Sequence, residues 1–241
     1  TRKESSAASD VYKRQQLYSS FCNGEMLLTN ATTAEMAKLT ENSFRDVNIA
    51  FANELSIISD KLGIDVWELI ELANHHPRVN ILNPGPGVGG HCIAVDPWFI
   101  VSSAQEEAKL IRTAREVNDG KPAYVIAKIT EAVEAEGADS IAALGIAFKP
   151  DIDDLRESPA LSIVQQMAEK WPEKNILVAE PNVNELPESL TAYQNVQLVD
   201  ASHAISSSPV VAVLVDHTPF KSLEKSVLEG KNVVDTRGMW S

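Results

Sequence analysis

Cysteine and positive charge are both scarce in this sequence. The 241 residues include two cysteines, Cys22 and Cys92, and no C-x-x-C pair, which excludes a disulfide scaffold and a thiolate zinc site. The 21 lysines and arginines are outnumbered by 34 aspartates and glutamates, giving a net charge of −13. This charge argues against nucleic acids and anionic membranes as partners, and so few cysteines fit a cytoplasmic protein.

Long apolar runs and metal-ligand patterns are also missing. No run approaches the roughly 18 to 20 apolar residues of a membrane-spanning helix, so we expect no membrane segment. His75 and His76 are adjacent, which on a helix turns them about 100° apart, and they have no partner at metal-ligand spacing. We therefore predict no metal. The chain is nevertheless 44% hydrophobic, enough for the cores of two modest domains.

The first half of the chain carries helical signals. Residues 1–24 open with a polar, aperiodic stretch, and we interpret them as a foreign or disordered segment. From Thr32, with Glu35 at capping-box spacing, apolar residues recur at helical spacing until Gly63 ends the run. Further helices are predicted from Asp65 to the HHPR stretch, from Ala104 to Val117 and, after the start signal Pro122, from Ala123 to Glu136.

The second half changes to short apolar runs with β-branched residues. These runs, SIAALGIAF, NILVAE, PVVAVLVD and NVVD, alternate with helical segments such as SPALSIVQQMAEK. Strands that alternate with helices indicate a parallel sheet. The predicted fold class is therefore α/β, with an all-helical domain at residues 25–120, a parallel α/β domain at residues 121–241, and a boundary within a connecting helix.

The stretch NPGPGVGGHC, residues 83–92, contains Gly85, Gly87 and Gly90 in the pattern G-x-G-x-x-G. This fingerprint binds a dinucleotide only where a strand enters it and a helix leaves it. Prolines stiffen the loop, and another proline falls in the following HCIAVDPWF, where the helix should grow. The dinucleotide interpretation therefore fails on context. We interpret the segment as a loop whose backbone N–H groups can approach a phosphate or a sugar.

Cys92 at the end of this loop is either a small buried hydrophobe or a nucleophile. Asp96 lies four residues on, near enough to act on a water or a proton at the sulfur. Lys38 and Asn42 share one face of the long helix at i, i+4 spacing. A lysine there is either a solvated edge or a group that stabilises an oxyanion and a thiolate.

The stretch GIAFKPDIDDLRESPA offers a second candidate site. Lys149 and Arg156 follow an apolar strand that ends at Phe148, which is where open α/β sheets bind ligands. The alternative is a charged surface turn in which the neighbouring aspartates pair with these cations.

Three motifs, AEMAKLTENSFRDVNIAFANE, GPGVGGHCIAVDPWF and GIAFKPDIDDLRESPA, resemble in this order and spacing the UDP-glucose/GDP-mannose dehydrogenase family. The resemblance runs from about residue 25 to the C-terminus. It implies a central helical dimerisation domain followed by a Rossmann-like α/β domain that binds UDP. The family's N-terminal NAD-binding domain and catalytic glutamate have no counterpart in this sequence, so we expect a truncated product that is inactive alone.

The resemblance also implies a reaction and residue roles. The family oxidises the C6 alcohol of a UDP-sugar to a carboxylate with two NAD+. Cys92 would form a thiohemiacetal and then a thioester, Lys38 and Asn42 would stabilise the oxyanion, and Asp96 would act on the hydrolytic water. The implied substrate-binding residues are Gly85, Gly87, Gly89, Gly90, His91, Lys149, Arg237 and, across a homodimer, Arg78; Arg156 would approach NAD.

Two questions about function stay open at this level. The motifs GGHC and VDPWF resemble those of family members that act on N-acetylmannosamine, and N-acetylglucosamine is the alternative sugar. His91 replaces a serine of glucose-specific relatives and either contacts the N-acetyl group or only packs beside the loop. An alternative of another class is a non-catalytic module that dimerises through an apolar face at residues 44–62 and binds a UDP-sugar.

Overall fold

The computed structural model describes residues 13–240, which fall into two units divided between residues 37 and 38. The first unit contains a helical stretch at residues 13–19 and the start of helix α2 (Ala31–Leu62), which continues into the second unit. Residues 1–12 lie outside the described part of the chain. The interpretation of residues 1–24 as foreign or disordered therefore stays a prediction.

The capping residue of helix α2 lies two residues earlier than its pattern indicated. The Asn30 Oδ1 accepts the backbone N–H of Thr33 at 2.8 Å, so Asn30 rather than Thr32 is the capping residue. Further along the helix, Phe44, Phe51 and Ile58 are exposed, whereas Asp46, Ala52 and Asn53 are buried. The helix is therefore buried along one side only, and polar side chains form much of its buried side.

Three more helices follow in the helical part: α3 (Val66–Asn74), α4 (Asp96–Ser103) and α5 (Lys109–Glu136). Helix α4 was not predicted. It leaves the glycine-rich loop with Pro97 in its first turn, where the missing N–H of proline is tolerated. The prediction that this proline prevents a helix was therefore wrong, although residues 79–82 form no strand before the loop.

Helix α5 is one continuous helix where we predicted two, and Pro122 lies inside it. Proline removes one helical hydrogen bond, but α5 is held by tertiary contacts on both sides of that position. The buried residues that make them are Arg115, Asn118, Lys121, Val125, Ile129 and Val133. Packing therefore overrides the local stop signal, and the predicted domain boundary falls within this helix.

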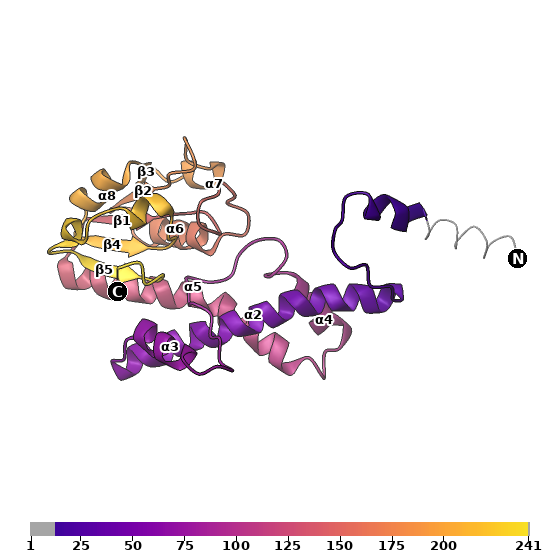
Figure 1. Cartoon of the computed structure of the whole chain (residues 1–241). Helices are drawn as coiled ribbons and strands as arrows, with labels where there is room; N and C mark the ends of the chain where they lie inside the picture. Colours follow the sequence, from indigo (N-terminus) through magenta and orange to yellow (C-terminus); the bar gives the residue numbers. More distant parts are fainter. Residues whose placement is uncertain (1–12, 241) are drawn as a thin grey trace, which may run out of the picture. The chain divides into compact units, whose positions relative to one another are not determined.

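The second half is a five-stranded parallel sheet in the order β3-β2-β1-β4-β5 (Figure 1). Its strands are β1 (Ser140–Leu144), β2 (Asn175–Ala179), β3 (Val196–Leu198), β4 (Val210–Val213) and β5 (Asn232–Asp235). The predicted α/β fold class is confirmed, whereas the three-residue edge strand β3 was missed. The strand we expected to end at Phe148 ends at Leu144, because Gly145 takes a left-handed φ of 87°.

Helices cover both faces of the sheet. Helices α5 and α6 (Pro159–Lys170) pack with one set of alternate strand residues, while α8 (Ala201–Ser207) and α9 (Thr218–Lys221) pack with the other set. The remaining short helices are α7 (Glu188–Thr191) and η1 (Lys225–Leu228). Within the described residues, no helix combines the length and apolarity needed to cross a bilayer.

The strand order predicts where a ligand crevice lies. Strand β1 pairs with β2 on one side and β4 on the other, so the chain reverses its winding direction between β1 and β4. In open α/β sheets, ligands bind outside the carboxyl ends of the strands at this point. The loop at residues 145–158, which contains Lys149 and Arg156, leaves β1 there.

Candidate active site

Cys92 is exposed, in the turn at residues 91–95 between the glycine-rich loop and α4. The backbone N–H of Asp96 donates to the Cys92 carbonyl at 2.8 Å. The Asp96 Oδ2 accepts a hydrogen bond of 2.5 Å from the Asn42 Nδ2 on α2. The side chains of Asn42 and Asp96 therefore meet although 54 positions separate them, and Cys92 lies one turn before Asp96 in the chain.

Lys38, the fourth predicted catalytic residue, lies one helical turn before Asn42. Its Nζ is 3.2 Å from the Glu41 carboxylate, and its side chain is 63% exposed. The structure thus gives Lys38 the solvated ion pair that was the alternative to a catalytic role. Its role beside Cys92 stays a prediction.

The glycines of the loop lie against the α/β half of the protein. A Cβ on Gly85 would meet the Arg237 guanidinium at 2.6 Å, one on Gly87 would meet Pro159, and one on Gly90 would meet the Phe148 ring. At Gly89 the obstacle is the backbone carbonyl of Glu157. Tight packing against protein atoms therefore accounts for these four glycines without any ligand.

A buried polar chain ties this loop to the helices. The backbone N–H of Gly85 donates to the Asn53 Oδ1, and the Asn53 Nδ2 donates to the Asn118 Oδ1, each at 2.9 Å. The Asn118 Nδ2 in turn donates to the Asp46 Oδ1 at 2.8 Å, and Arg115 donates to the same oxygen at 2.7 Å. The start of the loop is thereby fixed to both α2 and α5. Sequence reasoning missed these residues.

Of the predicted substrate-binding cations, Lys149 and Arg78 are exposed, and so is His91. Arg156 lies beside Asp154 and donates to both of its carboxylate oxygens, at 2.8 and 2.6 Å. These hydrogen bonds lower the pKa of Asp154 to about 2. The surface-turn alternative therefore holds for Arg156, while Lys149 makes no ion pair with the described residues.

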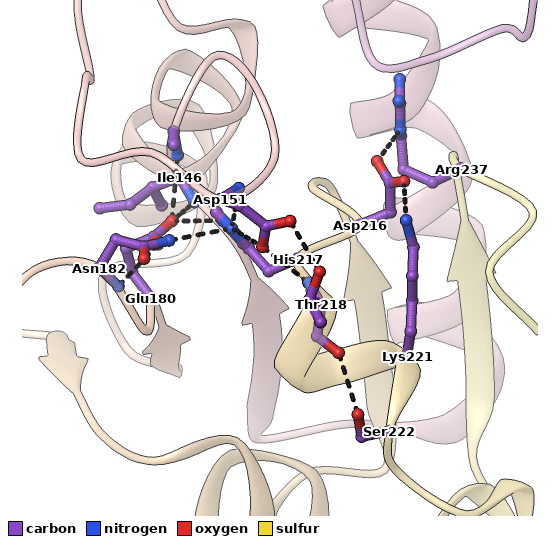
Figure 2. A network of polar contacts seen from close by, with 11 residues as sticks. Ile146, Asp151, Glu180, Asn182, Asp216, His217, Thr218, Lys221, Ser222 and Arg237 are labelled. Carbon is purple, nitrogen blue, oxygen red and sulfur yellow. Dashed lines mark hydrogen bonds and ion pairs between the residues drawn. The ribbon is translucent and has the colours of Figure 1, made fainter.

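Arg237 follows β5 and lies at the junction of the two halves. Its Nε donates to the Asp216 Oδ1 at 2.8 Å, and Lys221 donates to the other carboxylate oxygen at 2.6 Å (Figure 2). Burial alone would raise the pKa of Asp216, but these two cations hold it below its ordinary value. Arg237 thus contacts the glycine-rich loop while its charge is balanced by Asp216.

A cavity of about 590 Å³ opens elsewhere, between α2, α3, α5 and β5. None of the predicted site residues lines it. Lys121 lines it with 4% of its surface exposed, donates to the Ser56 Oγ at 2.5 Å, and lies 4.6 Å above the Tyr124 ring. Burial lowers the pKa of Lys121 to about 8.

Two further polar residues, Glu180 and His217, follow strands β2 and β4 and were not predicted (Figure 2). Glu180 ends the run NILVAE and His217 directly follows the run PVVAVLVD, both of which we had assigned to strands. Polar residues directly after buried parallel strands are the signal that would have found them, because such positions border the ligand crevice.

The chain matches two family models. Residues 32–120 match the central domain of the UDP-glucose/GDP-mannose dehydrogenase family, and residues 142–241 match the UDP binding domain of the same family. The two matches together leave out residues 1–31 and residues 121–141, which include the second half of α5.

Named relatives and solved structures agree with this match. The chain is 57% identical over 227 residues to the NDP-N-acetyl-D-galactosaminuronic acid dehydrogenase of Ralstonia nicotianae, covering 94% of this chain and 53% of the relative. It is 62% identical over 205 residues to the UDP-N-acetyl-D-mannosamine dehydrogenase of Campylobacter jejuni, covering 85% and 50%. The UDP-D-ManNAc dehydrogenase structure from Pyrococcus horikoshii superposes with a TM-score of 0.81 at 38% identity, covering 95% and 54%. This chain therefore spans about half the length of the relatives it matches.

Proposed function

The chain belongs to the UDP-glucose/GDP-mannose dehydrogenase family, and on this premise we propose that it forms the central and UDP-binding part of a UDP-N-acetyl-D-mannosamine 6-dehydrogenase. The observation that carries the proposal is the packing of Gly89 and Gly90 against the loop that follows β1. This packing brings the turn that contains Cys92 to the sheet edge at which open α/β sheets bind nucleotides.

NAD+ supplies the hydride acceptor for this chemistry. The glycine-rich loop does not suit it as a binding site, because its glycines are packed against Phe148, Pro159 and the Glu157 carbonyl, and no strand leads into it. Cofactor binding in the proposed enzyme therefore lies outside this loop. The residues described here serve the sugar nucleotide and the sulfur chemistry.

Cys92 is the proposed nucleophile. Its thiolate adds to the C6 aldehyde of the half-oxidised sugar to give a thiohemiacetal. The thiohemiacetal would lose its C6 hydride to the second NAD+ and its hydroxyl proton to a base, which gives a thioester that water hydrolyses to the carboxylate and the free thiol. Asp96, whose N–H is bonded to the Cys92 carbonyl, positions or deprotonates that water. Asn42 has a second amide hydrogen to donate to the oxyanion. Lys38 stabilises the same oxyanion by its positive charge once its ammonium leaves the ion pair with Glu41 and contacts the substrate.

Lys149 is the proposed contact to the UDP-sugar. It is exposed on the loop that leaves β1 and has no acidic partner within the described residues, so its ammonium is available to a diphosphate. Titration calorimetry of the 241-residue chain with UDP tests this role. Lys149→Ala should weaken UDP binding roughly 10- to 100-fold, the usual range for a charged hydrogen bond.

Lys231 provides the matched control. It precedes β5 and so lies at the amino ends of the strands, opposite the crevice. Lys231→Ala should leave UDP affinity unchanged. Equal affinity of the Lys149→Ala and wild-type chains would remove Lys149 from the site, and no UDP binding by the wild type would refute the proposed function.

The covalent step is tested in a chimera that joins the N-terminal half of the Campylobacter jejuni relative to this chain. Cys92→Ala in the chimera should abolish uronate formation and leave UDP-sugar affinity nearly intact, because binding rests on other residues. Cys22→Ala, also at an exposed cysteine, should change neither. Normal uronate yield from the Cys92→Ala chimera would end the covalent mechanism, and a folded, UDP-binding chimera without turnover would favour the non-catalytic module.

A second substrate is favoured by the 57% identity to the N-acetyl-D-galactosaminuronic acid dehydrogenase of Ralstonia nicotianae. The wild-type chimera should therefore be assayed with the nucleotide-linked N-acetylmannosamine, N-acetylgalactosamine and N-acetylglucosamine. The ratio of kcat/KM values decides among them. The leading proposal requires the highest value for N-acetylmannosamine.

Homodimerisation is proposed through the exposed side of α2. Phe44, Phe51 and Ile58 are 70%, 53% and 45% exposed, and their spacing of seven residues places them on one side of the helix. A stripe of this kind marks an interface, and in the proposed dimer Arg78 of one subunit reaches the sugar bound by the other. Sedimentation should show a dimer that Phe51→Lys converts to a monomer, and a wild-type monomer at micromolar concentration would contradict the proposal.

A further inference from the structure

The histidine and glutamate that follow β4 and β2 form a buried pair on either side of β1 (Figure 2). The side chains of His217 and Glu180 are fully buried, and the His217 Nε2 lies 3.0 Å from the Glu180 Oε2. The Phe220 ring packs edge-on against the imidazole at 5.4 Å between ring centroids. The pair is thus held rigidly beneath the loop that leaves β1.

Glu180 anchors the start of that loop. Its Oε2 accepts the backbone N–H of Ile146 at 2.8 Å and that of Ala147 at 3.1 Å. Burial alone would raise the pKa of Glu180, but the hydrogen bonds from His217 and from the backbone hold it below its ordinary value. Glu180 is therefore an anion that accepts three hydrogen bonds at one oxygen.

His217 anchors the middle of the same loop, at Asp151. Its Nδ1 lies 2.9 Å from the backbone nitrogen of Asp151 and 3.1 Å from the Asn182 Nδ2. A backbone N–H can only donate, so the Nδ1 must be an unprotonated acceptor. The ring proton then resides on Nε2 and is donated to Glu180.

These hydrogen bonds hold the backbone on both sides of the exposed Lys149. The chain from Ala147 to Asp151 is tied at one end to Glu180 and at the other to His217, and these two side chains are bonded to each other. We propose that His217 and Glu180 are positioning residues that fix the loop and thereby present Lys149 to the diphosphate of the UDP-sugar. This inference rests on the proposed binding role of Lys149.

The backbone at Asp151 agrees with a held conformation of the loop. Asp151 has a φ of 60°, in the left-handed region that non-glycine residues rarely adopt. Its carboxylate accepts the backbone N–H of Thr218 at 2.8 Å and the Thr218 hydroxyl at 2.7 Å. The residue after His217 thus holds Asp151 from a second side, and the strained turn is fixed by three hydrogen bonds.

Two substitutions at His217 separate positioning from mere stability. In His217→Asn, the amide oxygen occupies the place of Nδ1 and still accepts the Asp151 N–H. In His217→Gln, the amide reaches Glu180, but nothing accepts the Asp151 N–H. We expect both variants of the full 241-residue chain to melt at lower temperature. In calorimetry with UDP, His217→Gln should bind about tenfold more weakly, because the competent loop is less populated, and His217→Asn within about threefold of the wild type.

Equal UDP affinity of the two folded variants would overturn the inference, since a purely structural role predicts no difference. Absence of UDP binding by the wild-type chain would instead refute the proposed function, and with it the inference. A readout that needs no folded variant is the imidazole nitrogen spectrum of the wild type. It should show His217 protonated at Nε2 alone, and protonation at Nδ1 near neutral pH would contradict the proposed clamp.

Discussion

The ion pair between Asp46 and Arg115 joins α2 to α5 and allows a quantitative prediction of stability. The two side chains are 0% and 2% exposed, and Arg115 Nη1 lies 2.7 Å from Asp46 Oδ1. Asp46→Asn keeps an oxygen that can accept the hydrogen bonds from Arg115 and Asn118, so the variant removes charge and little else. Breaking a buried pair costs about 3–5 kcal/mol, and we expect Asp46→Asn at the lower end of this range because the Arg115 Nη2 also pairs with the Asp119 carboxylate.

The remaining polar atoms of the pair show which contact the variant weakens. Among the described residues, the Asp46 Oδ2 and the Arg115 Nε have no hydrogen-bond partner, so within the pair the variant weakens the one bond between Arg115 Nη1 and Asp46 Oδ1. For a chain of this length, about 3–5 kcal/mol corresponds to a fall in melting temperature of roughly 6–20 °C. Urea unfolding and thermal melting of the same variant measure both quantities.

A double variant supplies the control. Asp46→Leu combined with Arg115→Met removes both charges and should be less destabilised than the sum of the two single changes, since apolar residues of similar size often replace buried pairs well. A loss below about 1 kcal/mol in Asp46→Asn, or strict additivity in the double variant, would refute the reasoning. The charge pair would then not be what joins the helices.

The pH dependence of Arg115→Met follows from the carboxylate left behind. Burial raises the pKa of Asp46 above its ordinary 3.8 even though Arg115 and Asn118 lower it, and loss of Arg115 should raise it further. A raised folded-state pKa gives stability that is present below the unfolded-state value and lost as pH rises through the folded-state value. Lowering the pH from 7 toward about 4 should therefore reduce the difference in unfolding free energy by which Arg115→Met is less stable than the wild type.

Two further predictions concern packing and burial. Gly89→Ala should destabilise the chain, because its Cβ would overlap the Glu157 carbonyl. Gly120→Ala has open space around the added Cβ inside α5 and should stabilise the chain by about 0.5–1 kcal/mol in urea unfolding. The reverse order of stabilities would refute the packing described for the loop. Lys121 has a folded-state pKa of about 8 against 10.5, so the unfolded chain binds more protons between these values and stability rises with pH across that window. Lys121→Met should abolish that rise in urea midpoints measured at the two ends of the window, and an unchanged rise would show that another group causes it.

The fold could be predicted where the local pattern and the tertiary contacts agree. The runs NILVAE and PVVAVLVD contain β2 and β4 because four buried residues in succession mark a central parallel strand. The run NVVD contains β5, an edge strand whose four residues are only partly buried, and its β-branched residues mark it instead. Strand β3 has three residues and only one of them is buried, so it lacks the buried run. Pro122 was misinterpreted as a helix start because the contacts that keep α5 continuous come from residues distant in sequence.

The candidate site could be predicted in its parts and not in its connections. Cys92 and Asp96 are four residues apart, and their backbone bond follows from the turn that leads into α4. The contact of Asp96 with Asn42 depends on how α4 packs against α2, for which the sequence has no local pattern. The pair of Glu180 and His217 depends on strand order, because only an order that places β2 and β4 on the two sides of β1 brings these residues together.

The glycine-rich loop shows why the residue type does not identify the neighbour. Glycine is needed wherever another group must come closer than a Cβ allows, and the same requirement arises for a phosphate and for a protein carbonyl. At Gly89 the neighbour is the carbonyl of Glu157, and at Gly90 it is the Phe148 ring. The spacing G-x-G-x-x-G therefore indicates that another group lies close to the backbone at three positions, and it does not indicate whether that group belongs to a ligand or to the protein. Because two of the loop's glycines contact the segment that contains Lys149, the loop's sequence is constrained by the domain junction, and any sugar bound beside Cys92 must lie on the side of the loop that this junction leaves open.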